Sequence, residues 1–154
     1  MDMRRARPDE AALLSDIALR AKAHWPYPAE QIAAWRNDLV VTPEQISSYP
    51  THVAQIDAIV TGFFLLEPQQ ENWTLEHLWV LPDYMRRGIG RALLSHAKDV
   101  AAAGGAEALT IDADPYAEPF YQACGAIRVG TIAAPIDGAP NRLRPQMYLP
   151  IVAR

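Results

Sequence analysis

The sequence predicts a mixed α/β (α+β) fold, in which a mostly antiparallel central sheet of about six to seven strands carries helices on both faces. Three observations lead to this prediction. Apolar residues recur at helical spacing in the N-terminal third, strand-forming residues crowd the segment 51–81, and helical and strand patterns then alternate to the C-terminus. Such alternation of elements is typical of a sheet that is covered by helices on both sides.

The N-terminal third is predicted to be mainly helical. A short first strand is expected over residues 3–6. The segment 8–23 begins with a proline suited to a first helical turn and has apolar residues on one face, which predicts a helix. A second, shorter helix is predicted over 29–39. Thr42 and Gln45 are spaced as in a capping box, so a further short helix is expected to begin there.

The rest of the chain is predicted to form the sheet and two more helices. Residues 51–56 and 58–66 are rich in strand formers and are expected to pair as a hairpin that reverses at Asp57-Ala58. The run 73–81 predicts another strand, which Pro82 ends. The remaining pattern predicts, in order, a helix over 91–103, a strand over 108–113, a helix over 117–123, and strands over 127–133 and 146–149.

Length and composition limit the class of protein. The 154 residues, half of them hydrophobic, are enough for one core and are expected to form one domain, 1–154. A formal net charge of -4 argues against a nucleic-acid partner, which favours a basic surface. One cysteine excludes an internal disulfide, and the absence of a long apolar run argues against a membrane segment. A soluble, cytoplasmic protein with a small-molecule or peptide substrate is therefore expected.

A glycine-containing turn between the strand 73–81 and the next helix is the most informative motif. Gly88 and Gly90 stand at the start of that helix, where unpaired amides and the helix dipole favour an anion and where glycines allow it close to the backbone. No Lys-Ser/Thr pair follows as in a Walker loop, and the third glycine of a dinucleotide fingerprint is missing. The motif therefore predicts a phosphate-binding turn of another kind.

Two motifs together resemble the GNAT N-acetyltransferase superfamily. The first is Val80-x-Pro82, followed by a basic loop and Gly88-x-Gly90, which is similar to the acetyl-CoA loop of that family. The second is the segment 114–126, with Phe-Tyr on a short helix that ends in glycine, which looks like its second CoA motif. The resemblance extends over nearly the whole chain. It implies a GNAT-type sheet, acetyl-CoA as the cofactor, and transfer of the acetyl group to a primary amine by direct attack in a ternary complex.

The resemblance also implies the cofactor contacts. The main-chain amides of residues 86–91 would hold the CoA pyrophosphate, and main-chain groups of Leu78 and Val80 would pair with the pantetheine arm like an added strand. The full set of expected cofactor-binding residues is Leu78, Trp79, Val80, Met85, Arg86, Arg87, Gly88, Ile89, Gly90, Arg91, Asp114, Ala117 and Phe120.

Two residues are expected to be catalytic. Tyr121 resembles the tyrosine that donates a proton to the departing thiolate, and a phenol is protonated at neutral pH. Glu76 is the first candidate for the base, because period-two alternation places it on one face with Thr74, Leu78 and Val80. His24 is the second candidate. His77 is expected to point to the other face, as a packed or surface residue.

The acceptor amine is expected to bind near His24, Trp25 and Tyr27, at the end of the first helix. Cys124 is expected to pack rather than to act as a nucleophile, and no metal site is expected, since Asp112 and Asp114 have no flanking histidine.

Alternatives to acetyl transfer remain open at this level. The family usually has Gln or Arg where this chain has Met85, and often Asn where it has Asp114. These departures leave room for a CoA-binding sensor or interaction module without turnover. A longer acyl-CoA is a further alternative, and a homodimer contact through the chain beyond Gly130 also stays open.

Overall fold

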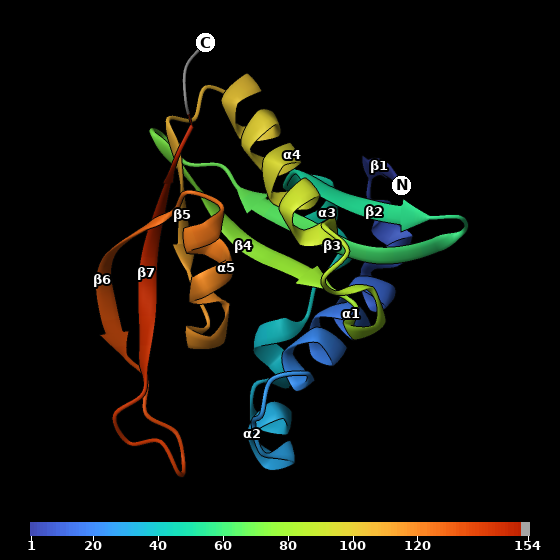
Figure 1. Cartoon of the computed structure of the whole chain (residues 1–154). Helices are drawn as coiled ribbons and strands as arrows, with labels where there is room; N and C mark the ends of the chain where they lie inside the picture. The colour runs from blue at the N-terminus through green and yellow to red at the C-terminus, as the bar shows by residue number, and fades with distance from the viewer. Residues whose placement is uncertain (152–154) are drawn as a thin grey trace.

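A computed structural model describes residues 1–151 and shows one mixed sheet of seven strands (Figure 1). The order across the sheet is β1-β2-β3-β4-β5-β7-β6, and every neighbouring pair is antiparallel except β4 and β5. The mixed, mostly antiparallel sheet predicted from the sequence is therefore confirmed. The strands are β1 (Asp2–Arg5), β2 (Thr51–Ile56), β3 (Ile59–Glu67), β4 (Asn72–Val80), β5 (Ala108–Asp112), β6 (Ile127–Ala133) and β7 (Leu143–Pro150).

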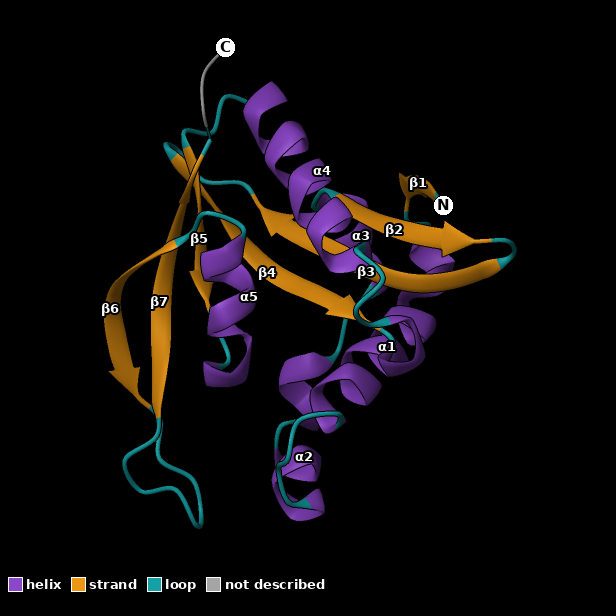
Figure 2. Ribbon diagram, in the orientation of Figure 1, coloured by secondary structure: helices purple, strands orange, loops and turns teal. Residues whose placement is uncertain are grey.

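Helices cover both faces of the sheet (Figure 2). Helices α4 (Ile89–Ala103) and α5 (Glu118–Ala123) pack on one face, around a core that includes Phe64, Leu93 and Met147. Helices α1 (Ala11–Ala23) and α3 (Pro43–Ser48) pack on the other face, around Phe63, Leu65 and Ile46, and α2 (Ala29–Ala34) follows α1. Four 3-10 turns complete the helical elements: η1 (Pro8–Glu10), η2 (Arg36–Leu39), η3 (Pro82–Tyr84) and η4 (Pro115–Ala117).

Local sequence signals explain where these elements begin and end. Thr42 Oγ1 accepts a hydrogen bond from the Gln45 amide, and Gln45 Oε1 accepts one from the Thr42 amide, which confirms the capping box at the start of α3. The predicted second helix is split by Trp35 into α2 and η2. Residues 152–154, at the end of the predicted 1–154 domain, lie outside the described residues. No helix within residues 1–151 is long and apolar enough to cross a membrane.

Strands β4 and β5 separate along most of their length. They are the only parallel pair among the described strands and are paired only where residues 72–74 meet residues 108–110. Beyond Thr74, the edge of β4 that faces β5 has no strand partner, and the two strands diverge (Figure 1). Unpaired main-chain groups therefore line an opening in the middle of the sheet.

A β-bulge in β4 corrects the predicted position of Glu76. Leu65 pairs with His77 and Leu66 pairs with Leu75, so Glu76 is the extra residue in β4. The alternation of side chains changes at this point, because Trp73 and Leu75 lie in the same core as Leu78 and Val80. The prediction that Glu76 and Thr74 share a face with Leu78 and Val80 was wrong, since period-two counting across the bulge assigns the faces incorrectly.

Two histidines are expected to make the folded protein sensitive to mild acid. His77 is buried and accepts a hydrogen bond at Nδ1 from Trp79 Nε1, and burial lowers its pKa from 6.5 to about 4. Burial and the nearby His96 lower the pKa of His52 to about 4 as well. Between these values the unfolded chain binds more protons than the folded one, so the free energy of unfolding should fall as the pH drops from 6.5 to about 4.

Urea denaturation between pH 4 and pH 8 measures this dependence. His77→Gln keeps an acceptor for Trp79 Nε1 but removes the titration, so this variant should lose about half of the pH dependence that the parent shows. If the free energy of unfolding depended on pH equally in the parent and in His77→Gln, the lowered pKa of His77 would be contradicted.

Candidate functional site

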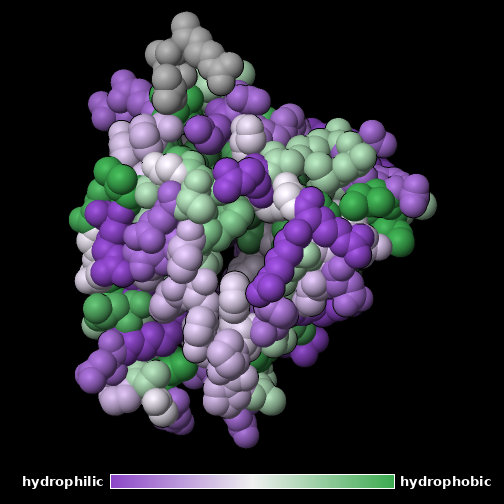
Figure 3. Space-filling model, in the orientation of Figure 1, coloured by the Kyte–Doolittle hydropathy of each residue, from purple (hydrophilic) through white to green (hydrophobic). Residues whose placement is uncertain are grey.

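The opening between β4 and β5 forms a cleft of about 500 Å³. The space-filling view shows a hollow near the middle of this face (Figure 3). The cleft unites most of the site residues predicted from the sequence: His24, Trp25, Glu76, Leu78, Trp79, Val80, Met85, Arg86, Gly88, Gly90, Arg91, Asp114, Ala117, Phe120 and Tyr121. The sequence prediction missed five further lining residues, which period and motif do not mark: Ala21, Leu75, Ile111, Asp112 and Ala113.

The turn before α4 has the backbone of an anion-binding loop. Arg86 and Gly88 both adopt positive φ, of 65° and 80°, and Gly88 caps the 15-residue helix α4. Successive amides in such a turn point toward one concave surface, and the helix dipole adds positive potential there. The turn therefore has the geometry to hold a pyrophosphate at the start of α4.

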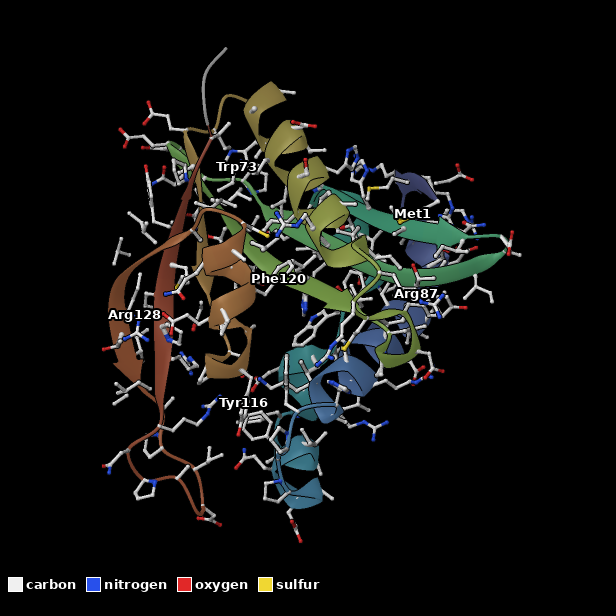
Figure 4. All side chains as sticks on the ribbon, viewed as in Figure 1. Met1, Trp73, Arg87, Tyr116, Phe120 and Arg128 are labelled. Carbon is white, nitrogen blue, oxygen red and sulfur yellow. The ribbon has the colours of Figure 1, made fainter. Side chains whose placement is uncertain are left out.

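Gly90 lets α4 and α5 approach each other within the cleft. A Cβ atom at Gly90 would lie 3.4 Å from the Phe120 ring and 3.8 Å from Val80 Cγ2. In the stick view, Phe120 extends from α5 toward the space between α5 and α4 (Figure 4). Gly90, Phe120 and Val80 all line the cleft, so a side chain larger than alanine at position 90 would take up space within it.

Two of the predicted cofactor-binding side chains point elsewhere. The guanidinium of Arg87 lies 5.1 Å from the centre of the Tyr84 ring, well away from Phe120 (Figure 4). Ile89 is buried in the core with Leu93. Neither residue lines the cleft, so a cofactor contact at these positions is left to the main chain.

Tyr121 lies at the wall of the cleft with only 8% of its surface exposed. Burial is the main cause that raises the pKa of its phenol above the ordinary value, and Cys124 and Asp114 add to the effect. The phenol is therefore fully protonated at neutral pH. Cys124 packs against the same core, as predicted for a packing residue.

Glu76 lies at the mouth of the cleft with an exposed side chain, because the bulge of β4 turns it out of the regular alternation. Desolvation raises the pKa of its carboxyl group, and the carboxylates of Glu67 and Asp112 raise it further. A carboxylate with a raised pKa is a stronger base than an ordinary glutamate, which suits proton removal near neutral pH.

The rings of His24 and Trp25 form one wall of the cleft at the end of α1, and Tyr116 supports Trp25 from outside the cleft. Trp25 stacks on Tyr116 with ring centroids 5.5 Å apart and an interplanar angle of 14°, and His24 meets Trp25 edge-on. Both His24 and Trp25 line the cleft as predicted, whereas Tyr27 does not. Tyr27 lies behind this wall, in edge contact with Tyr116 and Trp35.

Asp114 also lines the cleft, but its carboxylate is occupied by other residues of the protein. Oδ1 accepts a hydrogen bond from the Tyr116 amide at 2.8 Å, and Oδ2 accepts from Tyr27 Oη at 2.9 Å and pairs with Lys22 Nζ. Both carboxylate oxygens of Asp114 thus already accept hydrogen bonds within the protein, and its contact with the cofactor stays a prediction.

Comparison with known proteins agrees with this geometry. Residues 24–132 match the family described as acetyltransferase (GNAT) domain. No curated protein matches the chain. Among solved structures, a GCN5-related N-acetyltransferase from Rhodopseudomonas palustris is 25% identical, with a TM-score of 0.80 over 97% of this chain and 94% of that one.

Two further structures show the same fold at lower identity. The PaiA N-acetyltransferase of Thermoplasma acidophilum, in complex with coenzyme A, has a TM-score of 0.73 and 19% identity over 97% of this chain and 98% of that one. The ribosomal-protein-S18-alanine N-acetyltransferase of Escherichia coli has a TM-score of 0.75 and 22% identity, with 99% and 95% of the two chains covered.

Proposed function

Because the chain belongs to the acetyltransferase (GNAT) family and is an N-acetyltransferase that uses acetyl-CoA, we propose that it acetylates a primary amine of a small molecule or peptide by direct attack in a ternary complex. The observation that supports this proposal best is the cleft between β4 and β5. It brings the glycine turn, Tyr121 and Glu76 into one cavity, although they are distant in sequence.

The residues on the β4 and α4 side of the cleft fit the cofactor. Gly88 adopts the positive φ of the turn, and Gly90 leaves room beside Phe120. Arg86 and Arg91 add positive charge, and the free edge of β4 offers main-chain groups to an extended arm. Bound acetyl-CoA supplies an acetyl group activated as a thioester. Met85 lacks the polar side chain common in the family, so binding rests on the backbone amides and the two arginines.

Two side chains of the cleft are placed to move protons. Tyr121 Oη holds a proton at neutral pH and can donate it to a sulfur anion. Glu76, with its raised pKa, can remove a proton from the acceptor ammonium directly or through water. His24 lines the same cleft and is the second candidate for this base. Holding both partners in one cavity supplies much of the rate by orientation alone.

The Glu76→Gln variant tests the role of the base. We expect kcat/KM to fall about 10²-fold, because glutamine keeps the shape of the side chain but accepts no proton. In the parent, activity should decline as the pH falls through the raised pKa of Glu76, and in the variant this acidic limb should disappear.

The neighbouring carboxylate of Glu67 provides a control for the acidic limb of the pH–activity profile. Glu67→Gln removes one cause of the raised pKa, so the acidic limb should shift to lower pH while the maximal rate stays close to that of the parent. If the rate and the pH profile were unchanged in Glu76→Gln, Glu76 would not be the base. His24 would then be assigned this role, and His24→Gln would test it.

The overall proposal is tested by thiol release from acetyl-CoA against a panel of primary amines that includes diamines, amino sugars and peptides. Turnover with at least one amine is expected. Tight CoA binding in calorimetry without thiol release from any of them would instead favour a CoA-binding module, and a preference for longer thioesters would favour a different acyl group.

A further inference from the structure

A buried ionic cluster lies behind the acceptor side of the cleft. The four residues of the cluster come from separate segments: Lys22 from α1, Tyr27 from the loop before α2, Asp114 from the loop between β5 and η4, and Arg142 from the loop between β6 and β7. The side chains of Asp114 and Arg142 are only 7% and 8% exposed. Four segments of the chain that are far apart in sequence thus meet at one carboxylate.

The contacts within this cluster are numerous and specific. Arg142 donates a hydrogen bond to Tyr27 Oη at 3.1 Å and another to the Ala134 carbonyl at 3.2 Å, and its guanidinium lies 3.7 Å from Asp114 Oδ2. Its Nε, also buried, has no partner within residues 1–151. The rings of Tyr27 and Trp35 lie against both cations at centroid distances of 4.6 to 5.4 Å.

Charge makes Asp114 the essential member of the cluster. Two cations, Lys22 and Arg142, share one carboxylate, and the aromatic rings provide the remaining electrostatic stabilisation. Burial lowers the pKa of Lys22, while Asp114 opposes that shift. Removal of one partner from a buried ion pair leaves an uncompensated charge, so each member holds the others in place.

The cluster is connected to the aromatic wall of the cleft through Tyr116. The Tyr116 amide donates to Asp114 Oδ1, which caps η4, and the Tyr116 ring contacts Tyr27 on one side and stacks on Trp25 on the other. Figure 4 shows Tyr116 in the region between α5 and the end of α1. The orientation of Trp25 therefore depends on a residue that Asp114 fixes.

We propose that Asp114 and Arg142 are positioning residues for the acceptor and that Asp114 does not bind the cofactor. They hold the Tyr116 ring in its stack on Trp25, and this stack keeps Trp25 in place as a rigid wall of the acceptor end of the cleft. The link to catalysis rests on the proposed acetyltransferase function, but the link to the wall does not. The proposal assigns a role to Arg142, which no sequence motif marks, and gives Asp114 a role different from the cofactor contact expected at its position.

Indole N–H resonances in NMR spectra of the whole protein test the wall directly. Trp25→Phe identifies the Trp25 signal among those of the four tryptophans. In Arg142→Met, this signal should broaden or split because the stack loses its support. In Arg128→Met it should remain unchanged, since Arg128 pairs with Glu118 on the surface outside the cleft. An unchanged Trp25 signal in Arg142→Met would overturn the proposal.

A milder variant covers the case in which Arg142→Met does not fold. Tyr27→Phe retains the ring but removes both the hydrogen bond to Asp114 and the acceptor for Arg142. It should broaden the same Trp25 signal to a smaller degree. A sharp, unshifted Trp25 signal in this variant would likewise argue against the proposal.

Kinetics separate positioning from a general effect on stability. With the best acceptor of the amine panel, KM for the acceptor should rise about tenfold in Arg142→Met and Asp114→Asn, because a mispositioned wall weakens binding at that end of the cleft. The dissociation constant for CoA should stay within about twofold of the parent value, since the affected wall does not hold the cofactor. If Asp114→Asn lost more affinity for CoA than for the acceptor, Asp114 would be a cofactor-binding residue and the proposal would be overturned.

If the parent itself shows no turnover, the proposed function fails, while the NMR result still decides this proposal.

Discussion

Replacement of Gly90 by valine is expected to weaken CoA binding about 100-fold or more. The Cβ of the new side chain would meet the Phe120 ring at 3.4 Å and Val80 Cγ2 at 3.8 Å, and its two methyl groups would take up space within the cleft. Because these methyl groups would fill space that CoA needs, a 100-fold loss of affinity, about 2.7 kcal/mol, is expected. The stability of the fold should change little, because valine tolerates the helical backbone of α4 at least as well as glycine does.

Calorimetric titration with CoA measures this effect, and Gly130→Val is the matched control. A Cβ at Gly130 would meet no atom within 4 Å, and the residue lies on the exposed strand β6, outside the cleft. The control should bind CoA as the parent does. Equal affinity of Gly90→Val and Gly130→Val would contradict the assignment of the glycine turn as the cofactor site.

The Tyr121→Phe variant is expected to lose about 10²-fold in kcat while its KM for acetyl-CoA changes little, since general acid catalysis contributes at least this much. Phenylalanine preserves the packing of the ring in the core but removes the only proton that the side chain can donate. Because burial raises the pKa of the phenol, the parent keeps this proton throughout the neutral range. Deprotonation of Tyr121 should therefore cause no decrease in kcat as the pH rises to 9.

Single-turnover thiol release distinguishes this loss from slow product release. Tyr49→Phe is a suitable control, because Tyr49 packs against the core on the opposite face of the sheet. It should retain the parent kcat. A Tyr121→Phe variant as fast as Tyr49→Phe would assign the donated proton to another group.

Much of the fold could be predicted from the sequence because it depends on local physical chemistry. Apolar spacing, the capping pair Thr42 and Gln45, and the prolines and glycines at the ends of elements fix which residues can form a helix or a strand. The backbone of the glycine turn is likewise local, since positive φ at Arg86 and Gly88 is a property of residues that are neighbours in the chain. Most of the residues predicted to bind the cofactor line the cleft, and their contact with CoA stays a prediction.

The side of the cleft near Glu76 and Trp25 depends on contacts that no local pattern contains. A single bulge at Glu76 changes the face of every later residue of β4, and the register that creates it is set by pairing with β3. Asp114 obtains its partners from Lys22 and Tyr27, 92 and 87 positions away, and from Arg142 in a loop. The sequence by itself determined the elements and the glycine turn before α4, which arise from neighbouring residues. Only the tertiary structure decided which side chains line the cleft near Trp25, because burial of charge and strand register are properties of the assembled fold.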